Sequence, residues 1–323
     1  MNEAKVLVGD IGGTHARFAI ARRANGEWEI AHRSDIETEA LKFADVLHDY
    51  LGGIGNSDKP DAASIAVAGP VTNGRVSFTN RNWQLSEDEF KRIGFSHALL
   101  INDFAALAFA AAAAPPHKLA TIGPELKGLP EEPISILGAG TGFGVSCLAR
   151  YRGRSVPIAT EGGHMGFAPG NDREIAILTI LAKKFGHVSV ERVLSGPGIE
   201  NIHAALSDMS GRKVKPLEAS VIVDAARAGE AIATETLKIF CGVYGSVAGD
   251  FALAHGARGG VFIAGGIAQK IQDLIANSDF RARFEAKGRL SYFVKPIPTR
   301  LILDDNATFI GAAIAAEEFR DDK

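Results

Sequence analysis

The sequence predicts an α/β protein of two domains that enclose a cleft, and three observations support this. Segments with alternating apolar residues and segments with helical spacing follow one another repeatedly along the chain. The chain has 323 residues, which exceeds the usual size of one domain. Finally, VLVGDIGGTHARFAIA at 6–21 aligns without gaps over ISILGAGTGFGVSCLA at 134–149. Each copy reads as a strand, a glycine turn and a second strand, so a duplicated α/β core is predicted, with both turns facing one cleft.

The first half of the chain is predicted to alternate short strands with short helices. Strands are expected at 5–9, 17–21, 27–33, 63–68 and 98–101, and helices at 39–51, 86–93 and 104–114. Asn73-Gly74 is a preferred pair for a two-residue hairpin turn. Ser86 followed by Glu89 is a capping box, which begins a helix. Pro115-Pro116 ends the helix before it.

The second half begins after a proline-rich crossing at 115–133. A strand is predicted at 134–137, helices at 173–185, 219–228, 231–254 and 267–275, and a last helix at 307–319. We expect this last helix to fold back onto the first domain. The predicted domains are therefore a small one, 1–113 with 305–323, and a large one, 114–304.

Composition narrows the classes of function. The formal net charge is -3, whereas a nucleic-acid binder normally shows a basic excess or stripe. Two cysteines cannot build a disulfide framework or a multi-cysteine zinc site, and they fit a reducing cytosol. The longest apolar run, 104–114, is far shorter than the roughly 20 residues of a membrane-spanning helix. The N-terminus enters a strand pattern at once, unlike a signal peptide. We expect a cytoplasmic protein with no nucleic-acid or membrane partner.

Three glycine-rich stretches, at 9–14, 138–144 and 259–267, favour nucleotide binding when taken together. Glycine lets the backbone approach a ligand and present N–H groups to phosphate oxygens, although each stretch alone is equally explained as a tight turn. The chain has no P-loop motif. A dinucleotide fingerprint starting at Gly138 fails, because position six is Phe143 and a strand follows. Asp10 is predicted to hold Mg²⁺ through water near the phosphates, with a turn-capping role as the alternative.

Several polar residues stand where an apolar core is expected. Asn102 and Asp103 end a buried strand, although an unpaired carboxylate is costly to bury. Glu161 and His164 lie in EGGHMGFAP, and Glu191 lies in HVSVERVLSGPG. No cysteine or second histidine nearby completes a metal site, and Glu191 alone reads as a solvated helix residue. Together the five residues suit a neutral polyol, whose hydroxyls both donate and accept hydrogen bonds.

The motifs GDIGGT, TNRNW, INDF, GAGTGFG, EGGH-GFAP, GHVSVERVLSGPG and GGVFIAGGI occur in this order along the chain. With them the sequence resembles the bacterial glucokinases of the proteobacterial type, in the actin-like/hexokinase superfamily. The resemblance implies ATP-dependent phosphorylation of the glucose 6-hydroxyl with Mg²⁺. It also implies a two-domain actin-like ATPase (ribonuclease-H-like) fold with a duplicated βββαβαβα core and a cleft between the domains. We further expect a homodimer.

The resemblance implies a role for each matched residue. Asp103 is the base that takes the 6-hydroxyl proton, and Asn102 orients the sugar. The remaining sugar-binding residues are Thr79, Asn80, Glu161, His164 and Glu191. The ATP-binding residues are Gly9, Asp10, Ile11, Gly12, Gly13, Thr14, Gly140, Thr141, Gly142, Gly265 and Gly266, of which the last two approach the adenosine.

Two departures and three alternatives accompany this assignment. His15 stands where the family usually has asparagine, so no role is assigned to it. The region after His164 has no cysteine, unlike the zinc-binding repressor–kinase group, so no zinc is expected. A kinase for mannose or fructose, a non-enzymatic sugar-sensing relative and an actin-like ATPase remain open alternatives.

Overall fold

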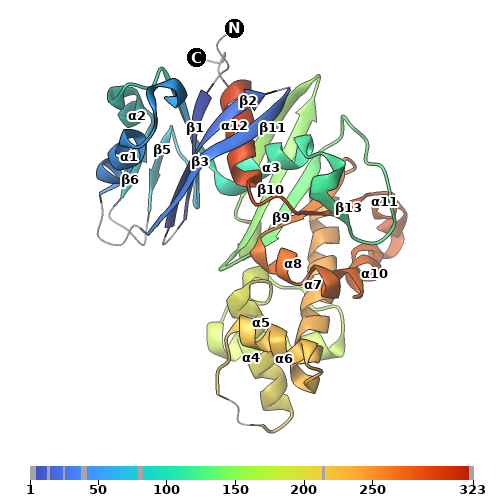
Figure 1. Cartoon of the computed structure of the whole chain (residues 1–323). Coiled ribbons are helices and arrows are strands. Elements are labelled where there is room, and N and C mark those ends of the chain that lie inside the picture. The colour runs from blue at the N-terminus through green and yellow to red at the C-terminus, as the bar shows by residue number, and fades with distance from the viewer. Residues whose placement is uncertain are drawn as a thin grey trace. The chain divides into compact units, whose positions relative to one another are not determined.

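The computed structural model describes residues 5–12, 15–24, 26–37, 42–78, 83–212 and 215–319 (Figure 1). The chain divides into two compact units, Met1–Ala114 with Asp304–Lys323, and Pro115–Leu303. We call them the terminal unit and the central unit. Each contains a large mixed sheet with helices packed on it.

The terminal unit is built on a five-stranded sheet in the order β3-β2-β1-β4-β7. Its strands are β1 (Lys5–Ile11), β2 (His15–Ala24), β3 (Glu27–Glu37), β4 (Ala62–Val67) and β7 (His97–Asn102). β1, β4 and β7 are parallel, while β2 is antiparallel to both of its neighbours. A separate hairpin pairs β5 (Arg75–Ser77) with β6 (Gln84–Ser86). The carboxyl ends of β1, β4 and β7 therefore share one edge of the sheet.

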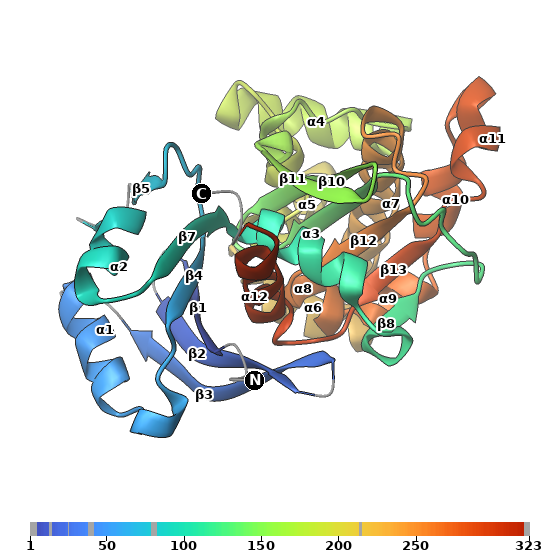
Figure 2. The ribbon, with the colours of Figure 1, turned by 90° about the horizontal axis from the view of Figure 1, so that it is seen from above.

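Helices cover both faces of this sheet (Figure 2). On one face lie α1 (Phe43–Gly52) and α2 (Glu87–Ile93), with aromatic contacts that join Phe43 to Phe18, Trp83 and Phe90. On the other lie α3 (Asp103–Ala113) and α12 (Ala307–Glu318), which contact each other. A Cβ on Gly311 of α12 would strike the carbonyl oxygen of Ala106. The absence of a side chain on Gly311 thus permits close packing of the two helices.

The central unit repeats this plan with one more strand. Its sheet has the order β11-β10-β9-β12-β13-β8. The strands are β8 (Leu119–Thr121), β9 (Ile134–Ala139), β10 (Phe143–Tyr151), β11 (Arg154–Thr160), β12 (Gly260–Ala264) and β13 (Thr299–Ile302). β9, β12 and β13 are parallel, and β10 is antiparallel to both of its neighbours. β9, β10 and β11 thus correspond to β1, β2 and β3, which confirms the predicted duplication.

The longest described helix of the central unit is α7 (Ala231–Ala254), and most of its residues are buried. The others are α4 (Asp172–Phe185), α5 (Gly196–Met209), α6 (Ala219–Arg227), α8 (Gly266–Lys270), α9 (Gln272–Ala276), α10 (Phe280–Glu285) and α11 (Ser291–Val294). Among the described residues, α7 is the one helix that has the length and composition to cross a membrane. However, 67% of its most apolar window is buried inside the structure, as in the central helix of a folded domain.

Several local predictions are confirmed. Asn73 and Gly74 have φ of +52° and +66°, and Thr72 and Arg75 exchange two backbone hydrogen bonds around them. The Ser86 hydroxyl accepts from the Glu89 N–H at 3.3 Å and begins α2. The last helix belongs to the terminal unit and contacts β1 and β4, as expected.

Other predictions are wrong or incomplete. The helix expected at 267–275 breaks at Ile271, which has φ −113° and ψ +26°, so it forms α8 and α9. The helix expected at 39–51 begins only at Phe43, and residues 39–41 lie outside the described residues. β8, β11 and α5 were not expected. β8 has three residues, β11 is an edge strand that contains Pro157, and α5 begins with Gly-Pro-Gly, which reads as a turn.

Candidate functional site

In the terminal unit, the predicted site residues gather where the parallel strands end. Ile11 of β1 lies opposite Val67 of β4, which in turn lies opposite Asn102 of β7. Asp10 and Gly12 therefore lie at the same edge of the sheet as Asn102 and Asp103. This is the edge at which open α/β sheets bind ligands. Gly13, Thr14, Thr79 and Asn80 lie outside the described residues.

Asn102 ends β7 and at the same time begins α3. Its side-chain oxygen accepts hydrogen bonds from the N–H groups of Phe104 and Ala105 at 3.0 and 3.1 Å, which makes it the N-cap of the helix. Its amide nitrogen donates to the Gly69 carbonyl at 3.3 Å. The amide has a second hydrogen, which it can offer to a ligand. The polar end of this buried strand thus has a structural cause, the capping of α3.

Asp103 follows as the first residue of α3 and is half-buried. Its Oδ1 accepts from the Phe104 N–H at 2.9 Å. The start of a helix favours a carboxylate, because the first N–H groups of the helix point toward it. The fold therefore holds an acidic side chain at the end of β7.

Asp10 belongs to a chain of charged side chains on β1, β2 and β3. Its Oδ2 lies 3.3 Å from Nη1 of Arg17, and Nε of Arg17 donates to Oδ2 of Asp35 at 3.0 Å. Nδ1 of His15 lies 3.0 Å from the other oxygen of Asp35. Burial raises the pKa of Asp10, and Arg17 opposes this increase. Burial also acts to raise the pKa of Asp35, but Arg17 and His15 together outweigh it and hold that pKa below its usual range.

Gly9 and Ile11, which were also predicted to bind ATP, lie within β1 and have packing roles there. Ile11 is 0% exposed and belongs to the apolar core of the terminal unit. A Cβ on Gly9 would lie 2.8 Å from Cδ1 of Ile65, so glycine is needed there for packing between β1 and β4. Packing within the terminal unit therefore accounts for an isoleucine and a glycine at these two positions of β1.

In the central unit, backbone pairing brings together two segments that carry predicted sugar-binding residues. Glu161 directly precedes the 3-10 turn η3 (Gly162–His164), which His164 ends, and Glu191 lies in the 3-10 turn η4 (Val190–Arg192). The Val190 N–H donates to the Met165 carbonyl at 2.8 Å, and a β-bridge joins Gly166 to Ser189. The two turns are therefore neighbours.

The side chains of Glu161 and His164 lie close to each other at the surface. Oε2 of Glu161 is 3.9 Å from Nε2 of His164, and the side chains are 69% and 63% exposed. Such exposed groups are available to a ligand. His187, which the sequence did not single out, shares a hydrogen bond of 3.0 Å between its Nε2 and the carbonyl oxygen of His164.

The glycine turn between β9 and β10 reaches the same place. The Phe143 N–H donates to Oε2 of Glu191 at 2.9 Å, and the Gly196 N–H donates to the Gly140 carbonyl at 2.8 Å. The structure thus connects Gly140, Thr141 and Gly142 to the segment that carries Glu191. Neither bond is visible in the sequence, because each joins residues from separate motifs.

Gly265 and Gly266 follow β12, which is parallel to β9. Gly265 has φ +92°, a conformation that favours glycine, and a Cβ on it would lie 2.5 Å from the Ala139 carbonyl oxygen. The turns after β9 and β12 are therefore in close contact. They leave the sheet at one edge, where two glycine-lined backbones can approach one ligand.

A buried ion pair anchors the helix that follows the Glu161–His164 segment. Glu174 of α4 is 1% exposed, and its two oxygens accept from Arg283 of α10 at 2.7 and 3.0 Å. The side chain of Asn171 accepts from the Glu174 N–H, and the Asn171 amide donates back to the Glu174 carboxylate. The spacing of Asn171 and Glu174 resembles a capping box, which is a signal in the sequence for the start of a helix.

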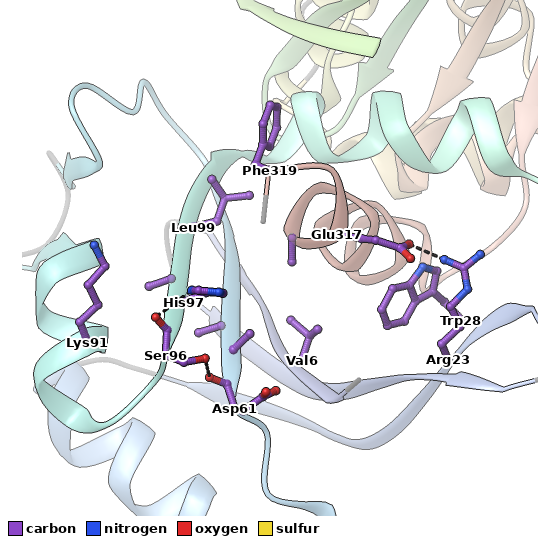
Figure 3. Close-up of a pocket in the computed structure, with 14 residues that line it drawn as sticks. Val6, Arg23, Trp28, Asp61, Lys91, Ser96, His97, Leu99, Glu317 and Phe319 are labelled. Atoms are coloured by element: carbon purple, nitrogen blue, oxygen red, sulfur yellow. Dashed lines mark hydrogen bonds and ion pairs between the residues drawn. The ribbon is translucent and has the colours of Figure 1, made fainter. Parts of the chain in front are cut away.

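A cavity of about 120 Å³ in the terminal unit is separate from these groups (Figure 3). It is lined by Val6, Ala62 and His97, at the amino ends of the strands whose other ends carry Asp10 and Asn102. Of the polar groups that line it, Arg23 and Glu317 form the ion pair shown in Figure 3, whereas the buried Nε1 of Trp28 has no hydrogen-bond partner among the described residues. Its place at the opposite ends of the strands separates the cavity from the predicted site residues. The cavity is therefore not the candidate active site.

Within the described ranges, no cluster of three or more His, Cys, Asp or Glu side chains could hold a metal ion. Mg²⁺ does not require such a cluster, because it keeps several waters and uses one or two carboxylates with substrate phosphates. The single acidic side chain of Asp10 beside the Gly12 turn fits that mode of binding.

Comparison with known proteins gives a consistent result. A family model described as Glucokinase matches residues 7–319. The chain is 49% identical over 311 residues to a glucokinase of Caulobacter sp. strain K31, covering 96% of this chain and 94% of that one. It is 39% identical over 309 residues to a glucokinase of Nitrobacter hamburgensis, covering 95% of each.

Solved structures show the same fold. The crystal structure of a glucokinase from an Antarctic psychrotroph is 37% identical with a TM-score of 0.89, covering 97% of this chain and 98% of that one. A ROK family glucokinase from Streptomyces griseus, in complex with glucose and AMPPNP, is 19% identical with a TM-score of 0.65, covering 98% and 100%. These likenesses confirm the predicted fold class, a two-domain actin-like fold.

Proposed function

The chain belongs to the glucokinase family, and from this premise we propose that it transfers the γ-phosphoryl group of ATP to the 6-hydroxyl of D-glucose. One observation in the structure carries the proposal furthest. In the central unit, the turn of Gly140–Gly142 and the segments of Glu161–His164 and Glu191 are joined by hydrogen bonds. A phosphate-binding turn beside polyol-binding side chains is the arrangement that a sugar kinase requires.

Asp103 acts as the general base in this proposal. Its carboxylate accepts the proton of the 6-hydroxyl as that oxygen attacks the γ-phosphorus atom. Phosphoryl transfer depends mainly on positioning and electrostatic stabilisation, so a fixed carboxylate at a strand end is well suited to the task. Asn102 orients the sugar with one of its two amide hydrogens. Its side-chain oxygen caps α3, and its other amide hydrogen is donated to the Gly69 carbonyl. Thr79 and Asn80 border the sugar.

Glu161, His164 and Glu191 bind the other hydroxyl groups. Carboxylates accept hydrogen bonds from hydroxyls, and the imidazole of His164 can donate or accept according to its tautomer. Glu191 has one oxygen bonded to the Phe143 N–H, which leaves the other to face the sugar.

The glycine turns hold the nucleotide. Gly12, Gly13 and Thr14, with Gly140, Thr141 and Gly142, line the phosphates, and Gly265 and Gly266 approach the adenosine. A Cβ on Gly12 or Gly140 would meet no heavy atom within 4 Å, so their surroundings leave room for a ligand. Asp10 would hold Mg²⁺ through water, and the ion would neutralise phosphate charge there. The glucokinase solved with AMPPNP, which has the same fold, supports ATP as the donor.

We also propose a cytoplasmic homodimer. Both free cysteines, Cys147 and Cys241, are buried, which fits a reducing compartment.

The edge strand β11 carries Val156 and Ile158, which are 52% and 48% exposed. An exposed apolar edge strand can pair with a second copy. Light scattering coupled to size-exclusion chromatography measures the mass of the particle and tests the dimer.

A coupled assay of ADP formation tests the proposed function. We expect ATP- and Mg²⁺-dependent turnover with glucose and a much lower rate without sugar. A panel of glucose, mannose and fructose separates a glucokinase from a kinase for another hexose. Glucose binding without turnover would instead indicate a sugar-sensing protein, and turnover that ignores sugar would indicate an ATPase.

A further inference from the structure

Gly142 lies in the turn assigned to the phosphates, yet its closest neighbour is a predicted sugar ligand. A Cβ built on Gly142 would lie 2.5 Å from Oε2 of Glu191 and 3.4 Å from its Cδ. This oxygen also accepts the hydrogen bond from the Phe143 N–H at 2.9 Å. The Glu191 carboxylate therefore rests on the backbone of residues 142–143, in a space that a side chain on residue 142 would fill.

The conformation of Gly142 does not itself require glycine. Its φ is outside the left-handed region, in contrast to that of Gly265. The φ of Gly142 therefore does not disfavour alanine, and the atoms in the way of a methyl group belong to the flexible end of Glu191. A methyl group here would move the carboxylate rather than the turn.

We propose that Gly142 and the Phe143 N–H are positioning groups for glucose, which act through Glu191. The Phe143 N–H fixes Oε2, so that the second oxygen is directed at a sugar hydroxyl, and the absence of a side chain on Gly142 makes that bond possible. This inference rests on the proposed function, because it takes Glu191 as a sugar ligand. It assigns to part of the phosphate turn a role in sugar affinity.

The chain provides a matched control in the same turn. A Cβ on Gly140 meets no heavy atom within 4 Å, and its φ is also outside the left-handed region. Gly140→Ala and Gly142→Ala therefore add the same methyl group two residues apart, and only the second displaces Glu191. Glu191→Gln and the double variant Gly142→Ala/Glu191→Gln complete a double-mutant cycle.

Calorimetric titration measures the Kd of glucose for wild type and all four variants, and steady-state kinetics measures the KM of both substrates. We expect Gly142→Ala to weaken glucose binding about tenfold to a hundredfold, the range for loss of a hydrogen bond to a charged group. The KM for ATP should change far less, and Gly140→Ala should leave the glucose Kd near that of wild type. In the Glu191→Gln background, Gly142→Ala should have a smaller effect, because the side chain that it displaces no longer makes a charge-assisted hydrogen bond to glucose.

A glucose Kd that is unchanged in Gly142→Ala, or an effect that is undiminished in the Glu191→Gln background, would overturn the inference. The melting temperature of each variant shows whether the protein is folded. Wild-type turnover, measured in the same series, tests the proposed function separately. An active wild type with unaltered glucose affinity in Gly142→Ala overturns only the inference, whereas a wild type inactive on glucose overturns both.

Discussion

At the scale of single residues, Asn102 and Asp103 show how one short stretch serves both fold and chemistry. The Asn102 side chain accepts two N–H groups of α3, and Asp103 begins that helix. Each side chain accepts hydrogen bonds from N–H groups of α3 and also presents a polar group at the ligand-binding edge of the sheet. Asn102 is predicted to act in capping and sugar binding, and Asp103 in proton transfer. Substitutions can therefore test the two roles separately.

Asp103→Asn should remove turnover while largely preserving glucose binding. The amide keeps the shape of the side chain and can hydrogen-bond a hydroxyl, but it cannot accept the proton. Loss of a general base typically lowers kcat by about 10²–10⁴. Calorimetric titration with glucose and the coupled assay measure the two effects. Turnover within a few-fold of wild type would remove Asp103 from the mechanism.

Asn102→Ala should destabilise the terminal unit through loss of the N-cap. Removing such a cap costs about 1 kcal/mol of stability. Asn102→Ser is the control, because its hydroxyl can cap α3 but has no amide hydrogen for a ligand. Thermal unfolding should show recovery in the serine variant, while glucose affinity should stay reduced. Equal glucose affinity in the serine variant and wild type would show that Asn102 serves α3 alone.

At the scale of elements, the ion pair between Glu174 and Arg283 joins α4 to α10. Burial acts to raise the pKa of Glu174, but the bonds from Arg283, the Gly170 N–H and Asn171 outweigh it and hold that pKa below its usual value. A carboxyl group with a lower pKa in the folded state stabilises the fold above its unfolded pKa. This contribution is lost as the pH falls through the folded pKa.

Glu174→Gln should therefore destabilise the protein most near neutral pH. Breaking the pair leaves the Arg283 guanidinium without the opposite charge of Glu174 and costs about 3 kcal/mol. The difference in melting temperature between wild type and Glu174→Gln should narrow as the pH falls below about 4.3, the usual pKa of glutamate. Glu235→Gln, in the exposed pair with Arg173, is the control and should have a small effect. A constant difference across the pH range would contradict a charged Glu174.

At the scale of the whole molecule, the proposed sugar ligands are divided between the two units. Asn102 and Asp103 belong to the terminal unit, and Glu161, His164 and Glu191 belong to the central unit. The family resemblance implies a cleft between the domains, and we expect glucose to close it. In kinases such closure also excludes water, which would otherwise hydrolyse ATP.

Solution scattering should accordingly show a smaller radius of gyration with saturating glucose than without it. A variant with Glu161→Gln and Glu191→Gln is the control and should show no decrease at the glucose concentration that saturates the wild type. An unchanged radius in wild type with bound glucose would contradict ligands drawn from both units.

Local chemistry explains which parts of the fold the sequence predicts well. The turn at Asn73-Gly74, the cap at Ser86 and the two strand–turn–strand copies depend on residues close together in the chain, and the structure contains all of them. The break at Ile271 and the edge strand β11 were not predicted. Their conformations depend on packing against distant elements, which local patterns do not report.

The same distinction holds for the candidate site. The sequence by itself determined the family and the residue types, because the glycine turns, the Asn-Asp pair and the EGGH motif are contiguous. Only the tertiary structure decided how these groups are held: Asp10 by Arg17, Asn102 by α3, and Glu191 by the Phe143 N–H. The last bond spans 48 residues, and its geometry arises only when η4 packs beside the turn between β9 and β10. The hydrogen-bond donors and acceptors can be read from the amino-acid sequence, but folding sets the distances between them.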